Sequence, residues 1–427
     1  MREDIIPASE APVVEDTRIH PTRMQRFARS LLLKRMARIE HGVLEVHDGE
    51  GSLRFGGEPG PDGLHAHIEV LHPQFWADAA FGGTTSAGEA YIHGLWKCDD
   101  LTALVRMMVA NRHVLEDVDG GATRLADVGR RVAHWLNRNS RQGSRRNISA
   151  HYDLGNEFFA LFLDPTMNYS CGIFESAEAT MEEASTAKMD AICRKLELKP
   201  GDHLLEIGTG WGGLAIHAAG RYGCRVTTTT ISRAQHEMAA ERIRAAGLEE
   251  RVELLLCDYR DLEGSYDKLV SIEMIEAVGH EYLDTYFRRC ANLLKPDGLM
   301  LLQSITIRDE LYAQALKSVD FIQRFVFPGG FLPSVAAMSA SLARTTDLQV
   351  LHLQDIGLHY ARTLNRWRER FFENIDAVRA LGYPDSFVRL WEYYLCYCEG
   401  AFLERNIGNV QLLLAKPRNR RESLGYA

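Results

Sequence analysis

The segment LLEIGTGWGG, residues 204–213, constrains the fold of this chain more than any other stretch. It places Gly208, Gly210, Gly212 and Gly213 between an apolar run typical of a strand and a segment typical of a helix. Glycines in such a loop let the backbone turn sharply and approach a ligand closely. The segment therefore predicts a nucleotide-type binding loop after the first strand of a parallel sheet.

Strand-like and helix-like segments alternate after residue 149. The strands expected in this part of the chain are 203–207, 224–231, 251–256, 267–272, 298–307, 348–356 and 409–415. The stretches expected to be largely helical after the fifth strand are 308–346 and 361–404. This alternation predicts an α/β fold, a doubly wound seven-strand sheet with a helical insertion after strand five and with ligands outside the carboxyl ends of the strands.

The N-terminal part has a different pattern. Residues 42–97 mix short alternating runs with Gly and Pro turns, which predicts a small α+β unit. Residues 119–148 are rich in Gly, Arg and Asn. We therefore expect an N-terminal domain over 1–118 that includes a basic helix, a linker over 119–148 and a catalytic domain over 149–427.

The charge of the chain is uneven. A net charge of −9 argues against a dedicated nucleic-acid binder, which is normally basic. Residues 18–39 nevertheless carry seven Arg or Lys and no acid, and a second basic stretch covers 130–147. At helical spacing, four apolar residues of the first stretch are expected on one face: Met24, Phe27, Leu31 and Leu32. Both stretches are either solvated surface or sites of attraction to anionic lipid headgroups.

The cysteines give no sign of a structural cross-link. All eight are widely spaced and none forms a C-x-x-C pair, so we expect neither disulfides nor a metal site. The sequence also shows neither an apolar run long enough to cross a membrane nor a basic-then-apolar leader. We expect a cytoplasmic protein that associates peripherally with the inner face of the membrane.

The glycine loop could bind either of two cofactors, a nicotinamide dinucleotide or S-adenosylmethionine. A nicotinamide enzyme would show G-x-G-x-x-G and an acid at the end of strand two. Here the spacing is G-x-G-x-G-G and strand two ends at Thr230, so S-adenosylmethionine fits better than NAD. At the end of strand three, Asp258 could accept a hydrogen bond from an adenine amino group and Tyr259 could lie against the adenine face. The alternative for these two residues is a turn acid and a half-buried tyrosine.

Several motifs resemble those of one family, the cyclopropane-fatty-acyl-phospholipid synthases and the related mycolic-acid methyltransferases. The resemblance runs from about His151 to Ala415. The matching motifs are HYDLGN (151–156), NYSCGIF (168–174), LLEIGTGWGGLA (204–215), TISRAQ (230–235), DYRDL (258–262), IEAVG (275–279), FPGGFLPS (327–334), IGLHYARTLNRW (356–367) and CEGAF (398–402). The N-terminal domain is similar to that of the bacterial, phospholipid-acting branch.

The resemblance implies a class I methyltransferase with a Rossmann-like sheet and an acyl-binding helical insertion. It implies S-adenosylmethionine as cofactor, and a methylene bridge added to the cis double bond of a phospholipid acyl chain at the membrane surface. The cofactor contacts that it implies are Tyr169, Ser170, Gly208, Gly210, Gln235 and Tyr259. It also implies a bound bicarbonate held by groups at Cys171, Glu276, Gln303, Ile305 and Tyr360. We further expect a homodimer formed through the N-terminal domain.

The chemistry of such a reaction explains these groups. An alkene is a poor nucleophile, so the methyl donor must be held in line in a dry pocket. Methyl transfer leaves a carbocation, and ring closure requires a base within reach of the new methyl group. Bicarbonate would serve as that base, with Glu276 accepting its proton and orienting it. Alternatively, Glu276 is a solvated acid and Tyr360 a core tyrosine.

Three features leave questions open. Gln303 stands where the best-known bacterial members carry His, and Gln cannot become a cation, so bicarbonate retention is in question. Cys398 precedes the G-A-F segment, but no neighbouring base activates it, and a buried thiol without one is inert. Cys171 is expected to act through its backbone N–H. Aromatic residues are expected to form the core and part of an acyl tunnel: Phe321, Phe325, Phe327, Phe331, Trp367, Phe371, Phe372, Trp391, Tyr393, Tyr394 and Phe402.

Three other functions compete with ring formation. The same fold could leave a methylene or methyl branch, because only a different proton must leave the cation; the methyl product would also require a reductase partner. A lipid-binding protein with a vestigial methyltransferase domain would bind no cofactor. A methyltransferase with a nitrogen or oxygen acceptor would need a polar acceptor pocket, for which the sequence gives no sign.

Overall fold

The structure is a computed structural model that describes residues 20–60, 63–114 and 154–421. Its contacts divide the chain into two compact units. The first unit comprises Met1–Leu136, Lys317–Pro328 and Ile375–Asn406, and the second comprises Asn137–Leu316, Gly329–Asn374 and Ile407–Ala427. This division differs from the expected one, because two segments of the expected catalytic domain belong to the first unit. The expected linker, 119–148, lies outside the described residues.

The first unit contains the predicted small α+β fold. Its four-stranded sheet has the order β2-β1-β3-β4, in which β1 runs parallel to β3 and antiparallel to β2. The elements are α1 (Arg23–Met36), β1 (Val43–Asp48), β2 (Gly51–Gly56), β3 (His65–Val70), α2 (Gln74–Ile92), β4 (Trp96–Cys98), α3 (Leu101–Ala110), α13 (Phe321–Phe325), α16 (Ile375–Ala380) and α17 (Asp385–Leu403). Helix α1 begins at a capping box formed by Thr22 and Gln25, which satisfies its first backbone N–H groups.

Helix α17 belongs to the first unit because it packs on α2 and α3. Thr102 donates a hydrogen bond to Glu399 at 3.1 Å, and Tyr91 donates one to Glu392 at 2.8 Å. Gly400 allows the close approach, since a Cβ there would lie 2.7 Å from a side-chain carbon of Val105. These long-range contacts cannot be read from a local helical pattern.

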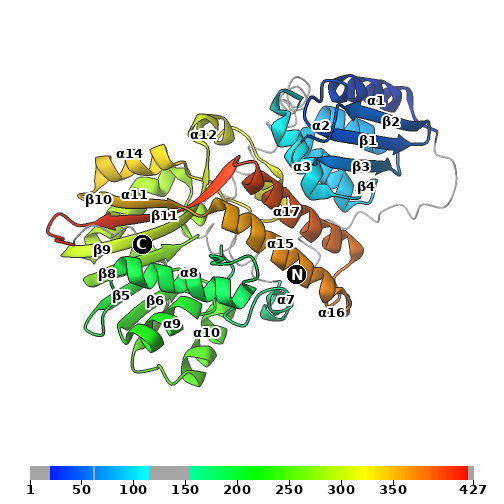
Figure 1. The fold of residues 1–427 in the computed structure, drawn as a ribbon. Coiled ribbons are helices and arrows are strands. Elements are labelled where there is room, and N and C mark those ends of the chain that lie inside the picture. Colours follow the sequence, from blue (N-terminus) through cyan, green and yellow to red (C-terminus); the bar gives the residue numbers. More distant parts are fainter. Residues whose placement is uncertain (1–19, 61–62, 115–153, 422–427) are drawn as a thin grey trace. The chain divides into compact units, whose positions relative to one another are not determined.

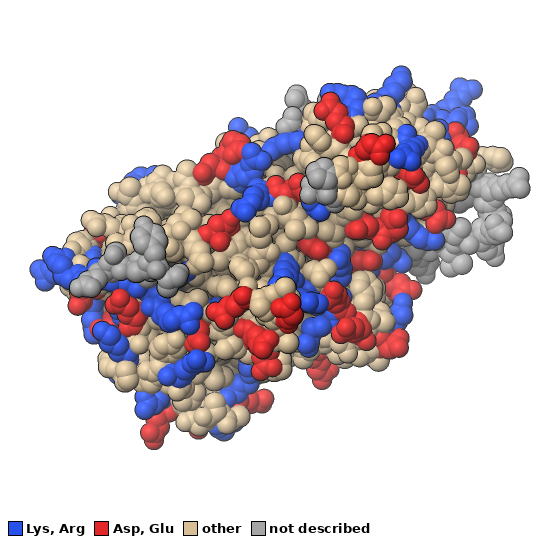
Figure 2. Space-filling model, viewed as in Figure 1, with Lys and Arg blue, Asp and Glu red and all other residues tan. Residues whose placement is uncertain are grey.

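Helix α1 exposes a basic and apolar outer surface. Its inner face buries Gln25, Ala28 and Leu32, whereas Met24 and Phe27 are 58% and 63% exposed. The expectation that all four apolar residues share one face is therefore wrong for Leu32, which turns toward the core. Figure 2 shows basic side chains over the part of the first unit where Figure 1 places α1.

The second unit contains the predicted seven-strand sheet. The order is β10-β11-β9-β8-β5-β6-β7; β11 is antiparallel to both of its neighbours, and the other pairs are parallel. The strands are β5 (His203–Ile207), β6 (Arg225–Thr230), β7 (Val252–Leu256), β8 (Tyr266–Ile272), β9 (Leu294–Ile307), β10 (Gln349–Asp355) and β11 (Ile407–Ala415). The strand order reverses between β5 and β8, where open sheets of this kind bind their ligands.

Helices cover both faces of this sheet (Figure 1). The helices of the second unit are α7 (Asn156–Ala160), α8 (Met181–Leu196), α9 (Gly213–Tyr222), α10 (Arg233–Ala245), α11 (Leu283–Leu293), α12 (Asp309–Ala315), α14 (Val335–Thr345) and α15 (Gly357–Glu373). One buried cluster joins the sheet to α11 and α14, and another joins it to α8 and α9. No helix in the described parts of the chain is long and apolar enough to cross a membrane.

Candidate active site

The glycine loop leaves β5 at the centre of the sheet. Gly208 has a φ of +106°, and a Cβ there would lie 3.3 Å from the Cβ of Met274, just beyond β8. A Cβ on Gly213 would lie 2.8 Å from the carbonyl oxygen of Thr166. Glycine is therefore favoured at position 208 by the positive φ and the tight contact, and at position 213 because a Cβ would overlap a backbone carbonyl oxygen. The loop forms a cradle that fits a nucleotide-like cofactor.

Residues at the ends of β6 and β7 lie beyond the same edge of the sheet. Thr230 donates a hydrogen bond to the side-chain oxygen of Gln235 at 3.0 Å, so these two predicted cofactor residues contact each other. Asp258 is buried and forms an ion pair with Arg260 at 2.6 Å, and its carboxylate also caps a short 3-10 helix, Tyr259–Asp261. The half-buried Tyr259 ring packs edge-on against Tyr286. The predicted adenine contacts of Asp258 and Tyr259 stay predictions.

The MNYSC segment, residues 167–171, lies between this cradle and α15. The ring of Tyr169 is centred 5.1 Å from Trp367, which makes an edge contact with Tyr360. Ser170 is buried and accepts a hydrogen bond at 2.9 Å from Lys188, a fully buried residue of α8. Packed aromatic rings thus connect Tyr169, a predicted cofactor contact, with Tyr360, a predicted catalytic residue.

Glu273, directly after β8, receives most of the donors that the sequence singled out. Its Oε1 accepts hydrogen bonds from the Cys171 backbone N–H at 3.1 Å, from Gln303 at 2.8 Å and from Asn409 at 2.6 Å. Its Oε2 accepts a hydrogen bond from the Tyr360 hydroxyl at 2.7 Å. Four hydrogen-bond donors thus converge on this one carboxylate.

A chain of side-chain hydrogen bonds fixes the direction of the Gln303 amide. The Lys195 ammonium can only donate, and it donates to the oxygen of Gln411 at 2.5 Å. The Gln411 nitrogen then donates to the oxygen of Gln303 at 2.9 Å. The nitrogen of Gln303 is therefore left to face Glu273.

Glu276 forms a second, separate carboxyl site three residues later. Its Oε1 accepts hydrogen bonds from the Ile305 backbone N–H at 2.6 Å and from Ser304 at 3.1 Å. Its Oε2 is shielded from solvent and has no partner among the described residues. Burial, and then the negative charge of Glu273, raises the pKa of Glu276 to about 8. The raised pKa favours the protonated form of this carboxyl group at neutral pH, and the expected role of Glu276 as an acceptor of the bicarbonate proton stays a prediction.

Lys188 supplies positive charge close to these acids. Its side chain is completely buried and donates to Asn168 and Ser170, both at 2.9 Å. Burial lowers the pKa of Lys188, and the charge of Glu273 is the largest influence that opposes this shift. Lys188 thus compensates part of the charge of Glu273 within the buried site.

Neither cysteine of interest is prepared for nucleophilic chemistry. The Cys171 thiol is completely buried and lies within donating distance of two carbonyl oxygens, those of Gly172 and Ile356, and burial raises its pKa well above the usual range. Burial likewise raises the pKa of Cys398, which lies on α17 in the first unit. A raised pKa suppresses the thiolate, which is the reactive form. Among the described residues no group of acids, histidines and cysteines could hold a metal ion.

Bicarbonate does not fit this arrangement of donors. Cys171, Gln303 and Tyr360 all donate to Glu273, and Ile305 donates to Glu276. The five groups expected around one anion are thus divided between two carboxyl groups of the chain itself.

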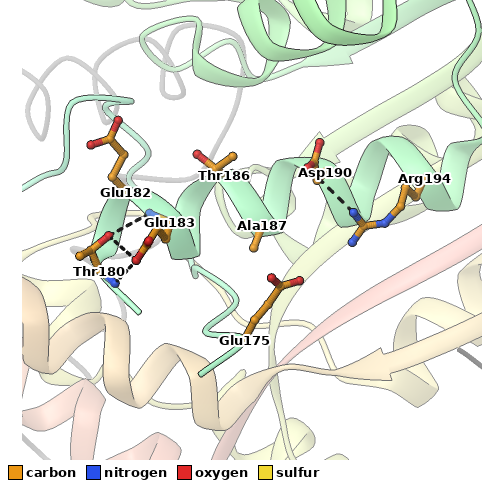
Figure 3. Close-up of a pocket in the computed structure, with 8 residues that line it drawn as sticks. All are labelled: Glu175, Thr180, Glu182, Glu183, Thr186, Ala187, Asp190 and Arg194. Carbon is orange, nitrogen blue, oxygen red and sulfur yellow. Dashed lines mark hydrogen bonds and ion pairs between the residues drawn. The ribbon is translucent and has the colours of Figure 1, made fainter. Parts of the chain in front are cut away.

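A surface pocket elsewhere on the second unit carries no comparable chemistry (Figure 3). It lies along α8, where Thr180 and Glu183 form the capping box of the helix and Asp190 lies within reach of Arg194 and Arg221. Figure 3 shows these side chains along the helix rather than converging on one point.

Three residues of the site were missed by the sequence analysis: Glu273, Asn409 and Lys188. Glu273 directly follows a predicted strand and lies three residues before Glu276. Its position at the carboxyl end of that strand could have marked it as a residue of the site. Asn409 opens the last predicted strand but carries no motif, and Lys188 is one of several charged residues on an ordinary helix. Only the fold brings these two residues to Glu273.

The strand order and the glycine cradle together define a class I S-adenosylmethionine-dependent methyltransferase. The family model described as mycolic acid cyclopropane synthetase matches residues 139–412. The chain therefore belongs to this family.

The chain is similar to proteins named as lipid methyltransferases and cyclopropane synthases. It is 38% identical to the tuberculostearic acid methyltransferase UfaA1 of Mycobacterium tuberculosis over 75% of this chain and 76% of that protein. It is 36% identical to the cyclopropane-fatty-acyl-phospholipid synthase of Escherichia coli K12 over 82% of this chain and 88% of that protein. The crystal structure of the mycolic acid cyclopropane synthase CmaA1 with SAH and CTAB is 33% identical, with a TM-score of 0.60, and covers 64% of this chain and 98% of that one.

Proposed function

We propose that the protein transfers the methyl group of S-adenosylmethionine to the cis double bond of an unsaturated phospholipid acyl chain and closes a cyclopropane ring. The observation that carries this proposal is the anionic site at Glu273, built beside the glycine cradle and shielded by aromatic side chains. An N- or O-methyltransferase does not need a base that can deprotonate a carbocation. The 36% identity to the Escherichia coli synthase, across most of both chains, supports the same assignment.

The residues around the cradle have two roles in the proposed reaction, binding the cofactor and shielding the reacting acyl chain. S-Adenosylmethionine, when bound, supplies an electrophilic methyl group. Eight residues would hold it: Tyr169, Ser170, Gly208, Gly210, Thr230, Gln235, Asp258 and Tyr259. The rings of Tyr169, Trp367 and Tyr360 exclude water and present faces that stabilise a cation on the acyl chain. The bicarbonate implied by the resemblance is not part of this proposal, because Glu273 engages its expected donors.

A branched product is the second candidate. The 38% identity to a tuberculostearic acid methyltransferase favours a branched product. The 36% identity to the Escherichia coli synthase favours a ring to the same degree. A ring and a methylene branch differ only in which proton leaves the cation, and a saturated methyl branch also requires a reductase partner that reduces the methylene product. Ring and branch are therefore alternative products of one site.

We propose that α1 docks the protein on anionic membranes at the cytoplasmic face. Met24 and Phe27 project from the helix between the exposed basic residues Arg23, Arg26 and Lys34. Exposed apolar side chains flanked by positive charge suit the boundary between headgroups and acyl chains. We also propose a homodimer formed through the N-terminal residues 1–118, which light scattering of the full chain and of a chain lacking them would test.

The test of the function is incubation of the full chain with unsaturated phospholipid vesicles and S-adenosylmethionine, followed by mass spectrometry of the lipids. We expect a mass gain of one methylene unit that survives catalytic hydrogenation as a ring. A gain that takes up hydrogen would instead identify a methylene branch. No product, together with no heat in a titration with S-adenosylhomocysteine, would identify a non-catalytic lipid-binding protein.

A further inference from the structure

We propose that Glu273 is the base that removes the proton from the methylated carbocation, so that this chain carries its own catalytic carboxylate. The inference rests on the proposed function and identifies the proton acceptor in that reaction. Glu273 was not among the residues that the sequence motifs singled out.

The hydrogen bonds leave one oxygen of Glu273 able to accept a proton. Oε1 is saturated, because it accepts from Cys171, Gln303 and Asn409. Among the described residues, Oε2 accepts a hydrogen bond only from the hydroxyl of Tyr360. A carboxylate oxygen has two lone pairs, so Oε2 retains one for a proton from the substrate.

The position of Glu273 is that of a reacting group. It follows the strand next to β5, at the reversal of strand order, and the residue after it packs against Gly208 of the cofactor cradle. Its backbone has a φ of +48°, a left-handed conformation that is uncommon and costly for a residue with a side chain. Such strain persists where the surrounding structure enforces it, and here the Glu273 N–H is held by the Gln303 carbonyl at 2.8 Å.

The atoms and charges balance without a further reactant. One alkene carbon forms a bond to the methyl group as the carbon–sulfur bond breaks, which leaves S-adenosylhomocysteine and a positive charge on the other alkene carbon. A C–H bond of the new methyl group then breaks, and its electron pair forms the second ring bond. The proton moves to Oε2 of Glu273, and the neutral carboxyl group later returns it to water.

The experiment compares bicarbonate dependence in the wild type and in three variants of the full chain. Glu273→Gln keeps the shape but removes the base, and Glu273→Gly opens the anion site with a residue that tolerates the positive φ. Glu263→Gln, at an exposed residue just before β8, is the matched control. Each protein is assayed on unsaturated phospholipid vesicles in carbon-dioxide-free buffer, with and without added bicarbonate or formate, and is titrated with S-adenosylhomocysteine.

We expect the turnover of the wild type to be independent of bicarbonate. The Glu273→Gln variant should turn over at least about a hundredfold more slowly than the wild type, a typical effect of losing a positioned base. Cofactor binding should be unchanged, and bicarbonate or formate should restore activity to Glu273→Gly. Loss of wild-type turnover in carbon-dioxide-free buffer, with recovery on adding bicarbonate, would overturn the inference and leave the proposed function standing.

A binding measurement tests the inference even if no lipid is turned over. Carbon-13 NMR with labelled bicarbonate should show a bound signal in the S-adenosylhomocysteine complex of Glu273→Gly but not in that of the wild type. A bound signal in the wild type would refute the inference whatever the outcome of the lipid assay. Absence of product from the wild type would count against the proposed function alone.

Discussion

Glu276→Gln replaces a shielded carboxyl group with a neutral amide of the same size. Burial and the charge of Glu273 raise the pKa of Glu276 to about 8, so the wild-type group is protonated at neutral pH. Its Oε1 accepts from Ile305 and Ser304, which places the proton on Oε2. The amide can keep its oxygen on these donors and put its nitrogen in the place of Oε2–H. The variant should therefore behave as a permanently protonated wild type.

The magnitude follows from proton linkage. A carboxyl group whose folded pKa lies above its unfolded value contributes stability that is fully present below the unfolded pKa of 4.5 and is lost as pH rises through about 8. From about pH 7 to about pH 9, the wild type should lose roughly 1.4 kcal/mol of unfolding free energy that Glu276→Gln retains. For a chain of 427 residues, that difference corresponds to a relative shift of roughly 1–2 °C in unfolding temperature.

The assay is thermal unfolding and turnover of both proteins across this pH range, with Glu263→Gln as control. We expect the unfolding temperature of Glu276→Gln to rise relative to wild type as the pH increases, while activity at about pH 7 stays within a few fold. Abolished activity at that pH, with S-adenosylhomocysteine binding intact, would show that the reaction needs an ionised Glu276. A stability difference that does not grow with pH would refute the raised pKa.

Three further predictions concern the surroundings of the site and the membrane surface. Tyr360→Phe removes the 2.7 Å hydrogen bond to Glu273 and, at about 1.5–3 kcal/mol for a bond to a charged group, should lower kcat roughly 10- to 100-fold while calorimetry shows unchanged cofactor binding. Cys171→Ser keeps the backbone donor and should retain substantial turnover, whereas a covalent role would abolish it. Replacing Met24 and Phe27 with serine should weaken cosedimentation with anionic vesicles, most clearly at low salt, without changing turnover of a detergent-dispersed substrate.

The sheet was predictable from the sequence because its signals are local. Each apolar run of about five residues lies between turn signals, and the glycine loop fixes which strand comes first. The expected strand 203–207 has the bounds that the structure gives to β5. Helix α17 was predicted as a helix within the catalytic domain, whereas its contacts group it with the first unit. Its burial depends on contacts with α2 and α3 nearly 300 residues away in the chain, such as Thr102 with Glu399.

The grouping of the site residues was harder to predict than their identities. Cys171, Gln303 and Tyr360 were each singled out, yet they donate to Glu273 rather than sharing an anion with Glu276. Glu273 and Glu276 are three residues apart at the end of one strand, and either could face the donors. The choice is made by the left-handed backbone at Glu273, which no sequence pattern specifies.

A glutamine at position 303 is consistent with a base that is a side chain of the protein rather than a bicarbonate ion bound from solution. A covalently held base does not have to be captured from solution, so the site needs donors that orient it rather than an extra cation that attracts it. The amide of Gln303 is such a donor, and its direction is set through Gln411 by Lys195. Positive charge is supplied instead by Lys188, which contacts Ser170 and not Glu273 itself. Separating charge compensation from orientation leaves Oε2 of Glu273 with the Tyr360 hydroxyl as its hydrogen-bond donor.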